Sequence, residues 1–357
     1  MSSNQALATE RALLKKKYLS EHRRRKRIIP VLIPVLIILI LTSAAVGSAN
    51  LSPVSVFTAL LGKLAGHETS ATTDAIIWNL RMPRILMGLI AGIALGSSGA
   101  VMQGVLRNPL ADPYILGISS AAGFGASLAI VMGKGLLAGP WAAVGNAFVF
   151  SILSSMLILT LAGRRSSSPQ VMVLIGLALL FFFQAMTTML QYFGTAEAVK
   201  AAVFWTVGDL GKSDWTKLGI AGTVTAAGTT VLITRSRSLN IMNAGDEAAE
   251  SLGIHTRATR HVVMITTSIM VATVVSFTGT IGFIGLVAPH LVRLISGSDN
   301  TVLIPGSALT GAVLLIAADT VARTVLSPVV LPVGAVTAFM GVPIFVYLIM
   351  RKGGILS

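Results

Sequence analysis

One short polar stretch between long apolar segments carries three acidic residues that could take part in chemistry. Asp246, Glu247 and Glu250 fall within residues 243–253, which read Asn-Ala-Gly-Asp-Glu-Ala-Ala-Glu-Ser-Leu-Gly. Acidic side chains suit the first turn of a helix because they face the positive end of its dipole, and Gly253 can adopt the left-handed conformation that ends one. The stretch predicts a short capped helix, either a solvated loop helix or a docking helix for a cytoplasmic partner.

The residue types that usually carry catalysis or bind metals show no such pattern. The five histidines form no His-Glu-x-x-His or paired spacing, and cysteine is absent, which excludes thiolate chemistry. No glycine-rich loop ends in Gly-Lys-Ser or Gly-Lys-Thr, so we expect no ATP site of the P-loop type. The sequence therefore predicts no catalytic residue, no metal site and no cofactor bound by this chain.

Composition places these residues in a membrane protein. Hydrophobic residues make up 54% of the chain, charged residues only 11%, and the mean hydropathy is +0.82. An average soluble domain has about 25% charged residues. Apolar runs long enough to cross a bilayer recur along the chain, and helices are the default element there because lipid offers no hydrogen bonds to the backbone. We expect about ten spans, over residues 28–47, 82–106, 114–133, 141–162, 170–193, 215–234, 259–281, 284–297, 303–324 and 334–350.

The expected organisation is an all-α, polytopic integral membrane protein with one transmembrane domain over residues 28–352, preceded by a basic segment over residues 1–27. The net charge of +14 does not indicate a nucleic-acid partner, because nine of the 27 Lys and Arg residues precede the first span. The positive-inside rule then places both termini in the cytoplasm, with the chain in the inner membrane. The basic start also suits anionic lipid headgroups.

The second span carries small residues at helical spacing. Gly88, Gly92 and Gly96 recur every fourth residue, which places them on one helix face. Small residues let helix backbones approach closely in a membrane. The pattern predicts close packing, either inside the subunit or between two copies.

Charged residues also flank two spans on the predicted outer side. Arg81 and Arg84 stand at the start of the second span, where they either reach outer headgroups or bind an acidic partner. Asp319 and Arg323 stand four residues apart near the outer end of the ninth span, so they can pair along the helix. Alternatively, Arg323 faces outward beside the other two arginines.

Several long motifs in one order resemble a known family. They occupy residues 81–84, 96–113, 116–123, 245–249, 279–293, 318–323 and 331–334. Together they resemble the FecCD-type (BtuC-like) permeases, the membrane subunits of ABC importers for iron-siderophores, haem and cobalamin. The resemblance runs from about residue 30 to residue 351 and leaves the basic N-terminal segment outside.

The resemblance implies the fold and partners of a type II ABC importer permease. Such a subunit has ten helices and pairs with a second permease, identical or related, around a central path. It works with two cytoplasmic ABC ATPase subunits, which hold ATP and Mg²⁺, and with an extracytoplasmic substrate-binding protein. The permease itself is not an enzyme.

The family's functional positions carry over to three sets of residues. The ATPase-coupling set is Gly245, Asp246, Glu247, Ala248, Ala249, Leu252 and Gly253. The set that docks the binding protein is Arg81, Arg84 and Arg323. The cytoplasmic gate set is Asn108, Leu110 and Ser167.

The sequence leaves open which substrate is transported and which energy source drives the transport. Ferric siderophores are the favoured cargo, with haem or cobalamin as alternatives on the same machine. A secondary transporter would need an intramembrane carboxylate that titrates, and Asp319 is the one acidic residue that we place well inside a span. A channel is disfavoured because Thr206-Val207-Gly208 continues with Asp209, unlike a potassium filter.

Overall fold

The computed structural model describes residues 28–47, 56, 58–59, 62, 71–137, 139–164 and 169–351. The basic segment over residues 1–27 and the predicted gate residue Ser167 lie outside the described residues. The described part of the chain is helical and contains no strand. The predicted all-α class is therefore confirmed.

The elements follow one another along the chain as a series of helices. They are α2 (Ile28–Ala45), α4 (Ala71–Asp74), the π-helical segment η1 (Ala75–Arg81), α5 (Met82–Val105), η2 (Pro113–Leu116), α6 (Ile118–Met132), η3 (Gly139–Trp141), α7 (Ala142–Arg164), α8 (Pro169–Tyr192), α9 (Ala196–Thr206), α10 (Trp215–Thr234), α11 (Ser236–Met242), α12 (Asp246–Ser251), α13 (Thr256–Thr278), α14 (Ile284–Ser296), α15 (Asn300–Thr324) and α16 (Val333–Arg351).

Each of the ten predicted spans corresponds to a helix, namely α2, α5, α6, α7, α8, α10, α13, α14, α15 and α16. Among the described residues, 7 helical segments are long and apolar enough to cross a membrane by themselves. The helices α6, α14 and α16 are apolar but shorter. The fold is that of a polytopic membrane protein.

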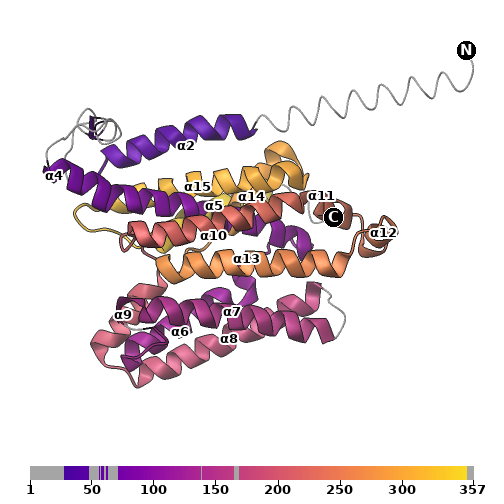
Figure 1. Cartoon of the computed structure of the whole chain (residues 1–357), viewed down its shortest axis with the longest axis horizontal. Coiled ribbons are helices and arrows are strands. Elements are labelled where there is room, and N and C mark those ends of the chain that lie inside the picture. Colours follow the sequence, from indigo (N-terminus) through magenta and orange to yellow (C-terminus); the bar gives the residue numbers. More distant parts are fainter. Residues whose placement is uncertain are drawn as a thin grey trace, which may run out of the picture.

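The long helices lie side by side in a bundle (Figure 1). The pair α5 and α15 shares the most extensive packing, and α14 and α2 pack on α15. The helices α6, α7 and α8 form a second group, and α13 contacts both groups through α5 and α7. The short helix α12 projects from one end of the bundle, called here the α12 end, and α9 lies at the opposite end, called the α9 end (Figure 1).

Small residues explain how closely α5 and α15 approach. A Cβ atom on Gly96 would overlap the carbonyl oxygen of Ser307, and one on Gly92 would overlap the backbone of Ala312. Both partners belong to α15, so the two glycines face a helix of the same chain. Any side chain at these positions would push the two backbones apart.

Gly88 differs from the other two members of the series. A Cβ atom there would lie 3.4 Å from Cδ1 of the Leu210 side chain, which is an ordinary van der Waals distance. The tight contact continues at the other end of the helix, where a Cβ on Gly99 would overlap the carbonyl of Gly285 in α14. The close approach therefore runs from Gly92 to Gly99, with Gly88 at its loose edge.

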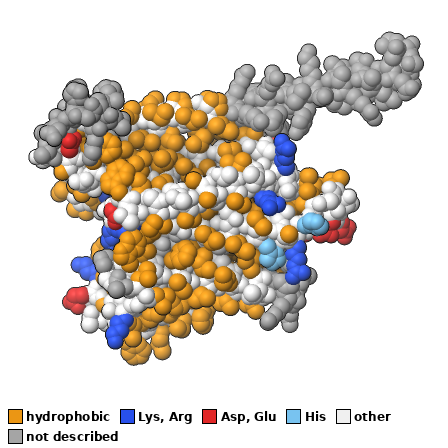
Figure 2. All heavy atoms as spheres, in the orientation of Figure 1, with side chains coloured by type: hydrophobic (Ala, Val, Ile, Leu, Met, Phe, Trp, Pro, Cys, Tyr) orange, Lys and Arg blue, Asp and Glu red, His pale blue; other side chains and the backbone are white. Residues whose placement is uncertain are grey.

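The surface of the bundle has the polarity of a membrane protein. Figure 2 shows hydrophobic side chains over the flank of the helices, with the charged side chains toward the two ends. On α8, for example, Phe181 is 61% exposed and Met189 is 61% exposed. Exposed apolar side chains of this size belong in contact with lipid or with another membrane subunit.

The spacing between α5 and α15 makes a matched pair of substitutions informative. We expect Gly96→Ala to destabilise the chain by roughly 1–3 kcal/mol, because the added methyl group meets a backbone carbonyl that cannot move aside. Gly88→Ala should change stability by less than about 1 kcal/mol, since only the side chains of Leu210 and Ile316 are near, both at ordinary van der Waals distance. Thermal unfolding of both variants in detergent checks this, and equal loss in both would contradict the assigned packing.

Candidate functional site

The α12 end carries the polar stretch that the sequence singled out. Gly245 has φ of 119° directly before α12, a conformation that L-residues rarely adopt. The helix itself is short, Asp246–Ser251, and Gly253 follows with φ of 81°. The predicted capped helix is thus present, with a glycine that permits each sharp change of chain direction.

Asp246 lies at the centre of an ionic contact that joins three helices. Its carboxylate accepts a hydrogen bond of 2.6 Å from Arg107, just beyond the end of α5, and one of 3.1 Å from Arg260 in α13. Arg260 is only 4% exposed, whereas the side chain of Arg107 is 44% exposed. Arg107 also donates a 3.1 Å hydrogen bond to the carbonyl of Met242 in α11. We call Asp246 with its two arginines the Asp246 clamp.

The rest of α12 divides into an anchored side and an exposed side. Ala249 is fully buried, and Glu250 accepts a 2.7 Å hydrogen bond from the Thr256 hydroxyl at the start of α13. Glu247 and Ala248 are exposed, and Leu252 just after the helix is 68% exposed. The predicted coupling residues therefore separate by their contacts. Asp246 and Ala249 contact the rest of the bundle, and Glu247, Ala248 and Leu252 are exposed.

Sequence reasoning did not identify Arg107 and Arg260 as partners of Asp246. Arg107 has φ of 48°, which is uncommon for a residue with a side chain. It precedes the predicted gate residues Asn108 and Leu110 in the turn after α5. Arg107 of the clamp is therefore the direct neighbour of Asn108 along the chain.

The turn itself is held by its own backbone and by Asn108. The Asn108 side chain accepts a 2.9 Å hydrogen bond from the backbone N–H of Leu110, and Leu110 is 48% exposed. Farther along, Asp112 caps η2 by accepting a 2.8 Å bond from the N–H of Tyr114. Burial raises the pKa of the Asp112 carboxyl to about 6, although that N–H favours the charged form. The turn is therefore held by hydrogen bonds within itself, and its gating role stays a prediction.

The three predicted docking arginines meet at the α9 end. Asp319 accepts a 2.8 Å hydrogen bond from Nε of Arg84 and a 2.9 Å bond from Nε of Arg323. Asp319 is 1% exposed, and the side chain of Arg84 is 13% exposed. The expected pairing of Asp319 with Arg323 along α15 is present, and Arg84 is a second partner that the sequence did not reveal.

Two of these arginines also satisfy the end of α2. The last carbonyl groups of a helix have no partner within the helix. Arg81 donates to the carbonyls of Ala44 and Ala45, and Arg323 donates to the carbonyl of Ser43 at 3.1 Å. Positive charge is also favourable at the negative end of a helix dipole. The guanidinium groups hold α2 against α5 and α15.

Arg81 and Arg323 are 6% and 9% exposed, so in this structure their side chains point into the protein rather than outward. Three positive charges and the single negative charge of Asp319 leave this arginine cluster with a net positive charge. Arg84 is its most exposed basic member. A role in docking an acidic partner stays a prediction that the geometry does not test.

No group of three or more His, Cys, Asp or Glu side chains suited to a metal ion occurs within the described ranges. Instead, the arrangement offers an exposed helix tied to two long helices at one end and a buried, positively charged cluster at the other. Such a layout can transmit movement between partners.

Comparison with known proteins identifies a family. The profile of the FecCD transport family matches residues 35–351. The chain is similar to the hemin transport system permease of Yersinia pestis, with 36% identity over 91% of this chain and 97% of the relative. It is equally similar to the vitamin B12 import system permease of Klebsiella pneumoniae, with 36% identity over 94% of this chain and 96% of the relative.

A solved structure extends the similarity to three dimensions. A metal-chelate type ABC transporter in an inward-facing conformation superposes with a TM-score of 0.81 and 30% identity, covering 91% of this chain and 99% of the other. Members of the matched family are membrane permease subunits of ABC importers, and ATP is hydrolysed by a separate ATPase. The chain therefore belongs to the FecCD transport family.

Proposed function

We propose that this permease moves an iron(III)–siderophore complex inward across the cytoplasmic membrane, with both of its termini in the cytoplasm. Two relatives are named for hemin and for vitamin B12, and a structural neighbour is of the metal-chelate type. Hemin and vitamin B12 are bulky metal chelates, and so is an iron(III)–siderophore complex. Haem or cobalamin on the same machine is the alternative cargo.

The observation that carries the proposed mechanism is the Asp246 clamp. It ties α12, which projects from the bundle, to the end of α5 and to the first turns of α13. A force applied to the exposed side of α12 therefore acts on two long helices at once. Because Arg107 is followed directly by Asn108, the same force reaches the proposed gate.

The partners follow from this arrangement. Of two cytoplasmic ABC ATPases, one contacts Glu247, Ala248 and Leu252 of this chain. The ATPases hold the ATP and Mg²⁺, so the permease itself binds no cofactor. A second permease subunit, identical or related, completes the path. For ATP to drive alternating access, the ATPase contacts must differ in free energy between the inward-facing and outward-facing states.

The arginine cluster is proposed to attract the extracytoplasmic binding protein. Its net positive charge favours acidic side chains on a partner and speeds their encounter. Arg84 is the member that can contact such a partner with the least rearrangement, because Arg81 and Arg323 also hold α2.

A secondary transporter finds little support in the same cluster. Asp319 is paired with both Arg84 and Arg323 rather than standing alone in a span. Both oxygens of its carboxylate accept hydrogen bonds, Oδ1 from Arg84 and Oδ2 from Arg323. Asp319 is therefore a structural partner for two arginines that hold neighbouring helices together.

Substitutions on the exposed side of α12 and in the Asp246 clamp should have different effects. Glu247→Lys with Leu252→Asp alters the exposed side, so we expect about a tenfold or larger loss of ATPase co-purification, which corresponds to about 1.4 kcal/mol. Arg107→Met removes part of the clamp but leaves that side intact, so the ATPase should still co-purify while uptake falls. Arg237→Gln, an exposed change on α11, serves as the control. Unchanged ATPase retention in the first variant would place the interface elsewhere.

Changing Arg84 tests the docking role. We expect Arg84→Gln to raise the substrate concentration needed for half-maximal uptake by up to about tenfold, and the loss to grow smaller at high salt, where charge attraction is screened. Arg237→Gln at the α12 end should leave uptake unchanged. If the Arg84 variant folds normally and shows wild-type uptake at low salt, the binding protein docks through other residues.

Cargo is tested directly by uptake into cells that lack this chain. Labelled ferric siderophores, haem and cobalamin are compared, each with ATP depleted or with the proton gradient collapsed. Loss of ferric siderophore uptake that the wild-type chain restores, and that requires ATP, is the expected result. Loss of haem or cobalamin uptake alone would show that haem or cobalamin is the cargo. Uptake that needs the proton gradient instead of ATP would contradict the proposed drive.

A further inference from the structure

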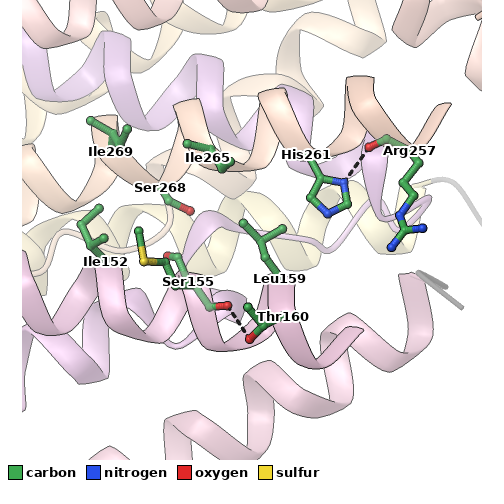
Figure 3. A pocket seen from close by; sticks show the side chains of 10 residues that line it. Ile152, Ser155, Leu159, Thr160, Arg257, His261, Ile265, Ser268 and Ile269 are labelled. Atoms are coloured by element: carbon green, nitrogen blue, oxygen red, sulfur yellow. Dashed lines mark hydrogen bonds between the residues drawn. The ribbon is translucent and has the colours of Figure 1, made fainter. Parts of the chain in front are cut away.

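A groove of about 600 Å³ lies between α7 and α13, apart from the clamp and the arginine cluster (Figure 3). Its walls are mainly apolar, with Ile152 and Leu159 on α7 facing Ile265 and Ile269 on α13. Two of the facing side chains are small, since Ser155 and Ser268 line the groove near its middle. The space exists because these two serines do not fill it.

The groove opens on the flank of the bundle. Met156 on one wall is 57% exposed and Ile265 on the other is 46% exposed. Both belong to helices that are long and apolar enough to span the membrane. An apolar groove that opens on this flank suits an acyl chain of the surrounding bilayer.

Basic side chains occupy the α12 end of the groove. Arg257 and His261 stand one helical turn apart on α13 (Figure 3). Nδ1 of His261 lies 2.7 Å from the carbonyl oxygen of Arg257. A carbonyl can only accept, so Nδ1 carries the hydrogen, and Nε2 of the neutral ring is an acceptor. Among the described residues that line the groove, none is acidic.

The length of the groove matches one leaflet of a bilayer. Arg257 and Ile269 are twelve positions apart on α13, which corresponds to roughly 18 Å at a rise of ~1.5 Å per residue. Half of a hydrocarbon core measures roughly 15 Å. A lipid with its headgroup at Arg257 would thus extend an acyl chain along the groove as far as Ile269.

We propose that this groove binds an anionic phospholipid from the leaflet at the α12 end. Its phosphate contacts the Arg257 guanidinium beside His261, and one acyl chain lies between Ile152 and Leu159 on one side and Ile265 and Ile269 on the other. A zwitterionic headgroup fits less well, because its ammonium group finds no carboxylate in the lining. The binding rests on the membrane-spanning fold and does not depend on the cargo or on the ATPase interface.

Native mass spectrometry of the full chain in detergent tests the site with phosphatidylglycerol and phosphatidylethanolamine as probes. We expect the wild-type chain to retain phosphatidylglycerol more strongly, and Arg257→Gln with His261→Gln to weaken that retention about tenfold. Arg237→Gln removes an exposed positive charge at the same end but outside the groove, so it should retain the lipid like the wild type.

A second variant tests the groove itself. Ile265→Trp adds bulk at an exposed wall position, so it should block retention of the lipid without disturbing the core. A variant that unfolds at the same temperature as the wild type is shown to be folded. Equal retention of both lipids, equal loss in the Arg237 variant, or full retention in the Ile265 variant would each overturn the proposal.

Discussion

The hydrogen-bonded contact between Asp246 and two arginines is the interaction on which the proposed function depends. Without it, α12 would be a six-residue helix joined to the bundle by two glycine-flanked turns, and a helix that short has little stability of its own. Arg260 is nearly fully buried, so Asp246 also provides a partner for a guanidinium that could not otherwise leave water cheaply. The same contact stabilises α12 and joins it to α5 and α13, so a movement of α12 is passed to both helices.

The α9 end also has a buried charged group that needs a partner, and there the buried charge at the centre is negative. There the buried partner is the carboxylate of Asp319, and the arginines around it also satisfy the carbonyl groups where α2 ends. Between the two ends, backbone contact at Gly92, Gly96 and Gly99 keeps α5 close to α15 and α14. A close-packed centre of this kind moves as a unit, which suits a protein that must pass a displacement from one end to the other.

Much of this architecture could be predicted from the sequence, because hydropathy and helical spacing are local signals. The ten membrane spans, the capped helix expected within residues 245–253 and found at Asp246–Ser251, and the pair of Asp319 with Arg323 follow from neighbours along the chain. The partners of Asp246 and the second partner of Asp319 could not be predicted in that way. Arg107 is 139 positions from Asp246, and Arg84 is 235 positions from Asp319, so their pairing depends on how the helices pack. For the same reason, the sequence suggested outward arginines where the structure has Arg81 and Arg323 buried.

A double-mutant cycle on the coupling ratio tests the central claim most directly. Transport per ATP hydrolysed is measured in vesicles for the wild type, Arg107→Met, Asp246→Asn and the double variant. If the two groups act through one contact, the double variant should be no worse than the more severe single variant, since the contact is lost only once. If the two losses multiply as they do for independent sites, the contact does not carry the coupling, and the proposed path from α12 to the gate is wrong.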